Sequence, residues 1–126
     1  MQKLFPTLLL GLLAAGCGQP QGSLQSHGKP VAHWLEELKK PDAKARKKAV
    51  TALAHVGKAD PAALPAVIAA VKDADPSVRD AAVLALLNPG PAARDAVPAL
   101  TEAKEDPDAT VRTHAARALE VIQKRN

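Results

Sequence analysis

The sequence predicts an all-α fold, a short α-solenoid in which six helices form three stacked pairs. Three observations predict it: a segment that recurs every 33 residues, an apolar composition dominated by alanine, and apolar side chains at helical spacing. Hydrophobic residues make up 47% of the chain, but aromatic residues only 2%. Alanine is the strongest helix former, whereas strands favour β-branched and aromatic residues, so this composition favours closely packed helices over a sheet.

The repeat is the strongest signal in the chain. Segments 42–53, 75–86 and 108–119 align without a gap at a spacing of 33 residues. Five positions are identical in all three copies: Asp42, Asp75 and Asp108; Arg46, Arg79 and Arg112; Ala49, Ala82 and Ala115; Ala52, Ala85 and Ala118; and Leu53, Leu86 and Leu119. A unit of this length cannot bury its apolar face alone, so the units are expected to stack.

In chain order, the first three helices are expected at about 30–40, 42–56 and 61–72. The first and third carry apolar residues at positions i, i+3, i+4 and i+7, the spacing of an amphipathic helix. These residues are Val31, Trp34, Leu35 and Leu38 in the first helix, and Leu64, Val67, Ile68 and Val71 in the third. The second begins at Asp42, whose carboxylate can cap free N–H groups, and stops near Gly57.

The remaining helices are expected at about 75–88, 92–105 and 108–124. The first of these begins at Asp75 and has Pro76 in the first helical position, where proline is well tolerated. It ends at the Asn-Pro-Gly sequence, 88–90. The last helix combines an apolar inner face with a polar outer face, as the terminal helix of a repeat array requires.

The first 16 residues have the pattern of a lipoprotein signal peptide. Lys3 precedes an apolar run, 4–15, which is too short to span a bilayer but has the length of a secretory signal core. The following Ala14-Ala15-Gly16-Cys17 sequence resembles the lipobox of bacterial lipoproteins. The resemblance implies cleavage before Cys17 and acylation of this cysteine. The alternative is an ordinary secretory signal in which Cys17 is incidental.

Residues 17–29 are expected to form the acylated cysteine and a flexible tether, because they are rich in Gly, Gln, Ser and Pro. Such a tether reaches roughly 20 Å, so the domain at 30–126 would lie close to the lipid surface. Gly18 follows the cysteine, in place of the aspartate that retains lipoproteins at the inner membrane. In a bacterium with two membranes, the resemblance therefore implies the outer membrane, facing the periplasm.

The repeated segment resembles HEAT repeats, in particular the short form seen in phycobilin-lyase-like proteins. The pattern that carries the resemblance runs from Asp75 through Val78-Arg79 to Leu86, with Ala at the two shared positions between them. Val111-Arg112 matches the same pair, and the first copy has Ala45-Arg46. The resemblance covers about 30–124 and implies an α-solenoid. The signature residues of ankyrin and tetratricopeptide repeats, which have similar lengths, are missing.

The recurring arginine is expected to hold the stack together, because an active site needs such a residue once and a stack needs it in every unit. The resemblance implies a ladder of ion pairs and hydrogen bonds built from Asp42, Arg46, Asp75, Arg79, Asp108 and Arg112. The spacing gives each arginine an aspartate at i−4 that can neutralise it. The alternative is a row of three arginines that binds an anion such as phosphate.

Nothing in the sequence points to catalysis. The four histidines are scattered, no metal-binding pair at i, i+4 stands beside a glutamate, and there is no glycine-rich phosphate loop. We therefore expect no enzyme activity, metal or cofactor. The net charge of +4 comes from interspersed residues of both signs, which does not indicate a nucleic-acid partner.

One surface is a candidate for binding a partner. The segment 61–71 carries no charge at all, and its alanines could form an apolar strip on the concave side, where the resemblance places the second helix of each pair. The strip is Ala62, Ala66, Ala69 and Ala70, and its charged rim is His33, Glu37, Arg94 and Glu102. The alternative is that neighbouring helices cover the strip.

Two hypotheses for function follow. The first is a membrane-anchored interaction or scaffold module, a monomer that binds another protein of the bacterial cell envelope. The second is an accessory or lyase-like protein that acts on a small molecule. An open groove would favour the first, and a deep pocket the second.

Overall fold

The computed structural model describes residues 25–56, 60, 62–87 and 93–125. Cys17, the signal segment and most of the tether lie outside these residues, as do the helix stops expected at Gly57 and at 88–90. The described residues form six helices: α1 (Val31–Glu37), α2 (Ala43–Val56), α3 (Ala63–Ala70), α4 (Pro76–Ala85), α5 (Ala93–Ala103) and α6 (Ala109–Lys124). The predicted all-α solenoid of three helical pairs is confirmed.

A small hairpin precedes the helices, where the sequence predicts only the end of a tether. Strands β1 (Gln25–Ser26) and β2 (Lys29–Pro30) pair antiparallel, with Gln25 opposite Pro30. The two residues between them, His27 and Gly28, have φ angles of 53° and 72°. Two-residue hairpin turns of this kind need positive φ at both positions, which glycine adopts freely.

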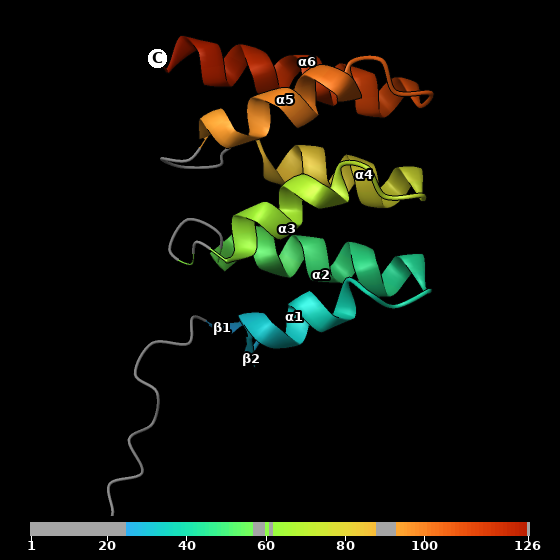
Figure 1. Cartoon of the computed structure of the whole chain (residues 1–126), viewed down its shortest axis with the longest axis vertical. Coiled ribbons are helices and arrows are strands. Elements are labelled where there is room, and N and C mark those ends of the chain that lie inside the picture. Colours follow the sequence, from blue (N-terminus) through green and yellow to red (C-terminus); the bar gives the residue numbers. More distant parts are fainter. Residues whose placement is uncertain (1–24, 57–59, 61, 88–92, 126) are drawn as a thin grey trace, which may run out of the picture.

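The helices lie in two layers (Figure 1). Helices α2, α4 and α6 stack directly on one another, whereas α1, α3 and α5 contact each other only sparsely and cover the first layer from one side. The helix α3, whose alanines were expected to form a binding strip, belongs to this second layer.

The shared alanines explain the close spacing of α2, α4 and α6. Five of the six are completely buried: Ala49, Ala52, Ala82, Ala115 and Ala118. A side chain of one carbon lets neighbouring helix backbones approach, and the shared leucines fill the remaining space. Leu53 and Leu86 are 0% exposed, and all six helices contribute to a single continuous core. Trp34 is 4% exposed and belongs to this core, as its register predicts.

The helices of the other layer end earlier than predicted, for a reason that recurs in each repeat. The chain after α1, α3 and α5 tightens into turns in which most N–H groups donate to the carbonyl three residues before. In the middle repeat, Val71, Lys72 and Asp73 donate to Ile68, Ala69 and Ala70 at 3.1–3.2 Å. These turns bring residues 40, 73 and 106 to the start of the following helix.

The recurring arginines connect one repeat to the next through these turns. The Arg46 guanidinium donates from Nε and Nη2 to the two carboxylate oxygens of Asp73, at 2.9 and 3.0 Å. Arg79 makes the same pair of bonds to Asp106, at 2.9 and 3.1 Å. The side chains are largely covered, with 14% of Arg79 and 8% of Asp106 exposed. Such bidentate pairs are strong and fix geometry.

Each arginine also holds the turn before its own helix. Nη1 of Arg79 donates to the carbonyl oxygens of Asp73 and Ala74 at 2.9 and 3.1 Å. Arg46 and Arg112 make the equivalent pairs of bonds, to residues 40 and 41 and to residues 106 and 107. Asp73 therefore accepts from Arg79 with its backbone, and from Arg46 with its side chain.

The aspartate expected to neutralise each arginine has another role. Asp75 accepts from the backbone N–H of Ser77 at 2.8 Å, and Asp108 accepts from Thr110 and Val111 at 2.8 and 3.1 Å. Asp42 accepts from Lys44 at 3.1 Å. The prediction of i−4 ion pairs is therefore wrong, because these carboxylates are used by the free N–H groups at the helix starts.

The ladder has two complete rungs within the part of the chain that the structure describes. Arg112 keeps its bonds to carbonyl oxygens, but it is exposed and no described carboxylate pairs with it. At the other end, Lys40 occupies the position that Asp73 and Asp106 hold in the later repeats. Burial raises the pKa of Asp73 and Asp106, but hydrogen bonds from the arginine and from a backbone N–H outweigh it, so both pKa values lie below 3.8.

We expect Arg79→Ala to lower the free energy of unfolding by about 1–3 kcal/mol, because the largely covered Asp106 carboxylate and two carbonyls lose their donor. Arg112→Ala should cost less, since it removes only contacts at an exposed position. Urea unfolding followed by circular dichroism measures both. Equal losses in the two variants would contradict a ladder that works between repeats.

Acid should weaken the same rung. Because the pKa of Asp106 is lowered in the folded protein, its contribution to stability is complete above pH 3.8 and is lost as the pH falls from there through the folded-state pKa. Asp106→Asn should therefore reduce stability at pH 7 and flatten its decline below pH 4 or so. The exposed neighbour gives a control, Glu105→Gln, which should follow the wild-type profile in urea melts across this range.

Candidate functional site

The expected alanine strip on α3 is not a continuous surface. Ala62 and Ala69 are exposed, but Ala66 is half-buried and Ala70, at 7% exposed, belongs to the core. The reason is that α3 contacts both α2 and α4, so the side of the helix that carries Ala70 is covered. The alternative reading, in which neighbouring helices cover the alanines, holds for this side of the helix.

The charged residues expected around that strip are mostly paired locally. Glu37 accepts from Lys40 at 2.6 Å and lies 4.0 Å from the His33 ring, which packs against Trp34. The hydrogen bond from Lys40 outweighs burial and lowers the pKa of Glu37. Glu102 bridges to Lys72 at 2.9 Å, and Arg94 is exposed on α5. These residues do not converge on one site.

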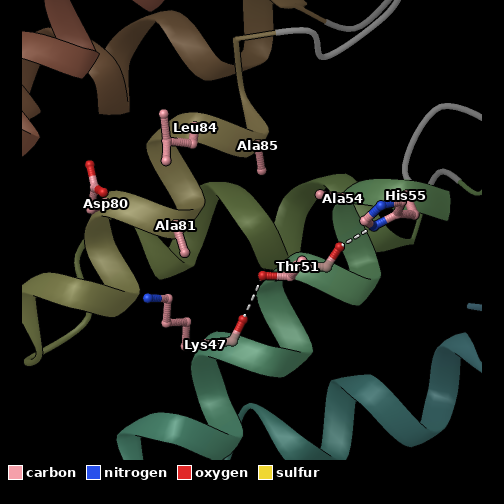
Figure 2. A pocket seen from close by; sticks show the side chains of 8 residues that line it. All are labelled: Lys47, Thr51, Ala54, His55, Asp80, Ala81, Leu84 and Ala85. Atoms are coloured by element: carbon pink, nitrogen blue, oxygen red, sulfur yellow. Dashed lines mark hydrogen bonds between the residues drawn. The ribbon is translucent and has the colours of Figure 1, made fainter. Parts of the chain in front are cut away.

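The opposite layer carries a groove between α2 and α4 (Figure 2). Its volume is about 330 Å³. The α2 wall consists of Lys47, Thr51, Ala54 and His55, and the α4 wall of Asp80, Ala81, Leu84 and Ala85. Alanines at three of these positions leave the space between the helices unfilled. Leu84 is 42% exposed, the one large hydrophobic residue exposed to this degree among the described residues.

The polar groups of the α2 wall are partly occupied within the helix. The Thr51 hydroxyl donates to the carbonyl oxygen of Lys47 at 3.0 Å, and the His55 ring Nδ1 lies 2.7 Å from the Thr51 carbonyl oxygen (Figure 2). On the α4 side, Asp80 lies 2.6 Å from the His114 ring of α6. These contacts hold the side chains of Thr51, His55 and Asp80 in place. The Lys47 ammonium makes no ion pair among the described residues.

A row of lysines continues the α2 wall. Lys44, Lys47 and Lys48 are all exposed, and with His27 and Thr51 they line a second hollow of about 400 Å³ beside the groove. Within the described ranges, Lys44 and Lys47 make no ion pair through their side chains. Lys48 lies 5.9 Å from the centre of the Trp34 ring. This side of α2 is therefore positive, and its Lys44 and Lys47 have no ion pair among the described residues.

This groove was not predicted from the sequence, although the repeat contains a signal for it. Leu84 aligns at the 33-residue spacing with Thr51 and Arg117, which are both polar and exposed. An apolar residue at a position that is polar in the other repeats marks an exposed hydrophobic. The exposed Leu84 is such a departure from the repeat.

The described residues offer little for other chemistry. They contain no group of three or more His, Cys, Asp or Glu side chains that could hold a metal ion. Over the same residues, no helix combines the length and apolar character needed to cross a membrane. The geometry thus defines a helical repeat protein with a grooved, positively charged layer.

Comparison with known families places the chain. The family model for HEAT repeats matches residues 31–120, which is most of the sequence, so the chain belongs to the HEAT repeat family. This confirms the resemblance of the repeated segment to HEAT repeats. A search of curated proteins finds no match. HEAT repeats commonly mediate protein–protein interaction.

Two substitutions on α3 test which of its sides is core. Ala70→Glu should lower the melting temperature markedly, because it forces a charge into the covered interface. Ala69→Glu makes the same change one position earlier, at an exposed site, and should leave the melting temperature within a degree or two of wild type. Thermal denaturation followed at 222 nm compares them. Similar melting in both variants would mean that the alanines form a free strip after all.

Proposed function

We propose that this protein is a membrane-anchored HEAT-repeat scaffold that binds another protein of the bacterial cell envelope. The observation that carries the proposal is the groove between α2 and α4, where Leu84 is exposed across from Lys47, which has no ion pair among the described residues. An exposed apolar residue with a charged surround has the anatomy of a specific protein interface. The tightly packed layer beneath it gives the groove a rigid base.

The anchor rests on the amino-terminal sequence. The short apolar run followed by Ala14-Ala15-Gly16-Cys17 supports export and acylation of Cys17. With roughly 20 Å of tether, the domain would meet partners at or near the lipid surface. Tethering also raises the local concentration of the domain, which compensates for the modest affinity of a small interface.

A small-molecule role is the second candidate, because about 330 Å³ reaches the lower end of ligand-binding pockets. The groove walls argue against it. Of the polar lining residues, Thr51, His55 and Asp80 already bond to neighbouring groups, and no described cluster of side chains suits a metal ion. A surface that accepts a protein segment fits these walls better.

Replacing Cys17 tests the anchor. Cys17→Ser should move the protein from the membrane pellet to the soluble exported fraction, because the acylated residue is lost. Fractionation followed by immunoblotting measures the shift, and Ser23→Ala provides a control within the same segment. A wild-type protein that is already soluble, or a variant that stays in the pellet, would exclude the lipid anchor.

Replacing Leu84 tests the groove. Recovery of a partner from a detergent-solubilised envelope should be lost with Leu84→Ser, because the exposed apolar contact disappears. Ala69→Ser, exposed on the opposite layer, should recover the partner as wild type does. Quantitative mass spectrometry of the recovered proteins compares the variants. Equal recovery in both would remove the groove from the proposal.

A further inference from the structure

The lysine row on α2 bears on what kind of partner the groove accepts. Lys44, Lys47 and Lys48 occupy positions i, i+3 and i+4, so they lie on one side of the helix. Neither Lys44 nor Lys47 has an acidic partner among the described residues. Elsewhere on this protein, exposed lysines do find carboxylates: Lys39, Lys72 and Lys124 each pair within 2.9 Å. Lys29 and Lys104 also have no ion pair among the described residues, but Lys44 and Lys47 lie together on one side of α2.

We propose that the groove binds an acidic segment of a partner protein, with its carboxylates on Lys44, Lys47 and Lys48 and one apolar side chain packed against Leu84. This inference rests on the proposed function and adds the chemistry of the partner. The charges complement each other along α2, and Leu84 and the alanines of α4 provide the apolar contact on the other wall.

The spacing of the lysines suits such a segment. Lys44 and Lys48 are one helical turn apart, about 6 Å along the axis of α2. Side chains on one face of an extended chain repeat every 6.6 Å or so, and those one turn apart on a helix repeat at about 5.4–6 Å. Carboxylates at either spacing can therefore face both lysines, with Lys47 between them at the groove itself.

A lipid surface fits the same face less well. Anionic headgroups would also attract the lysines, so the shape of the face and not its charge separates a lipid surface from an acidic segment. The alanines that line the space are recessed between two helices, in the more closely spaced layer of the stack. A flat bilayer surface does not reach into such a groove, whereas a side chain of a bound segment does.

Three synthetic peptides test the proposal. The protein used is the Cys17→Ser variant, which carries no lipid, needs no detergent and keeps its natural sequence from residue 18 onward. The first carries glutamates around a central leucine, the second replaces every glutamate with glutamine, and the third replaces the leucine with serine. Fluorescence anisotropy should show the first binding about ten-fold more tightly than either other peptide. Its binding should weaken as salt rises from about 0.05 to 0.5 M, because added ions screen the lysines.

Charge reversal assigns the contact to α2. Lys47→Glu should lower the affinity for the acidic peptide by about ten-fold or more. Lys104→Glu, an identical change at an exposed site after α5, should leave the affinity as in wild type. Circular dichroism of both variants checks that the fold is retained. Equal binding of the glutamate and glutamine peptides, or equal effects of the two reversals, would overturn the proposal.

Lipid vesicles distinguish an acidic protein segment from an anionic membrane as the source of negative charge. Phosphatidylglycerol vesicles should not sediment the Cys17→Ser protein at physiological salt, and they should not displace the acidic peptide. Lysine-dependent vesicle binding without peptide binding would assign the face to lipid and overturn the proposal. If the acidic peptide does not bind while partner recovery still depends on Leu84, the proposal of an acidic segment is wrong but the scaffold function stands. If partner recovery does not depend on Leu84 either, both the acidic segment and the proposed function are wrong.

Discussion

The bidentate contact between an arginine of one repeat and an aspartate of the next is the constraint on which the rest of the structure depends. Helices α1, α3 and α5 touch each other only sparsely, so their spacing is set at the turns where Arg46 meets Asp73 and Arg79 meets Asp106. The same guanidinium holds the turn before its own helix. One side chain thus fixes both the shape of a turn and its distance to the next one.

The sequence predicted the arginine half of this contact but not the aspartate half. Arginine recurs in all three repeats, whereas the aspartate at the partner position recurs in two and is Lys40 in the first. A pairing that crosses from one repeat to the next always leaves one position of the series without a partner. A comparison of residues shared by every copy therefore identifies the aspartates that cap the helix starts, which act within one repeat. It does not identify Asp73 and Asp106, the partners of the arginines.

The fold was predictable because it depends on periodicity, and the surface was less so because it depends on which side of a helix is covered. Ala69 and Ala70 are chemically identical and differ only by a rotation of about 100° around α3, yet one is exposed and the other is core. Composition cannot separate them. The useful clue lay in departures from the repeat, as at Leu84, and it bears directly on the candidate groove.

Lys40 has a consequence for how copies of this protein can meet. The ladder has a direction, since each arginine points toward the repeat that follows it. A second copy that stacked on α6 in the same direction would set its Lys40 against Arg112 of the first, and two cations would face each other where every internal joint has an ion pair. Head-to-tail contacts of this type generate open filaments when they form. Lys40, which pairs with Glu37 in its own repeat, therefore cannot supply the acceptor that Asp73 and Asp106 supply at the internal joints.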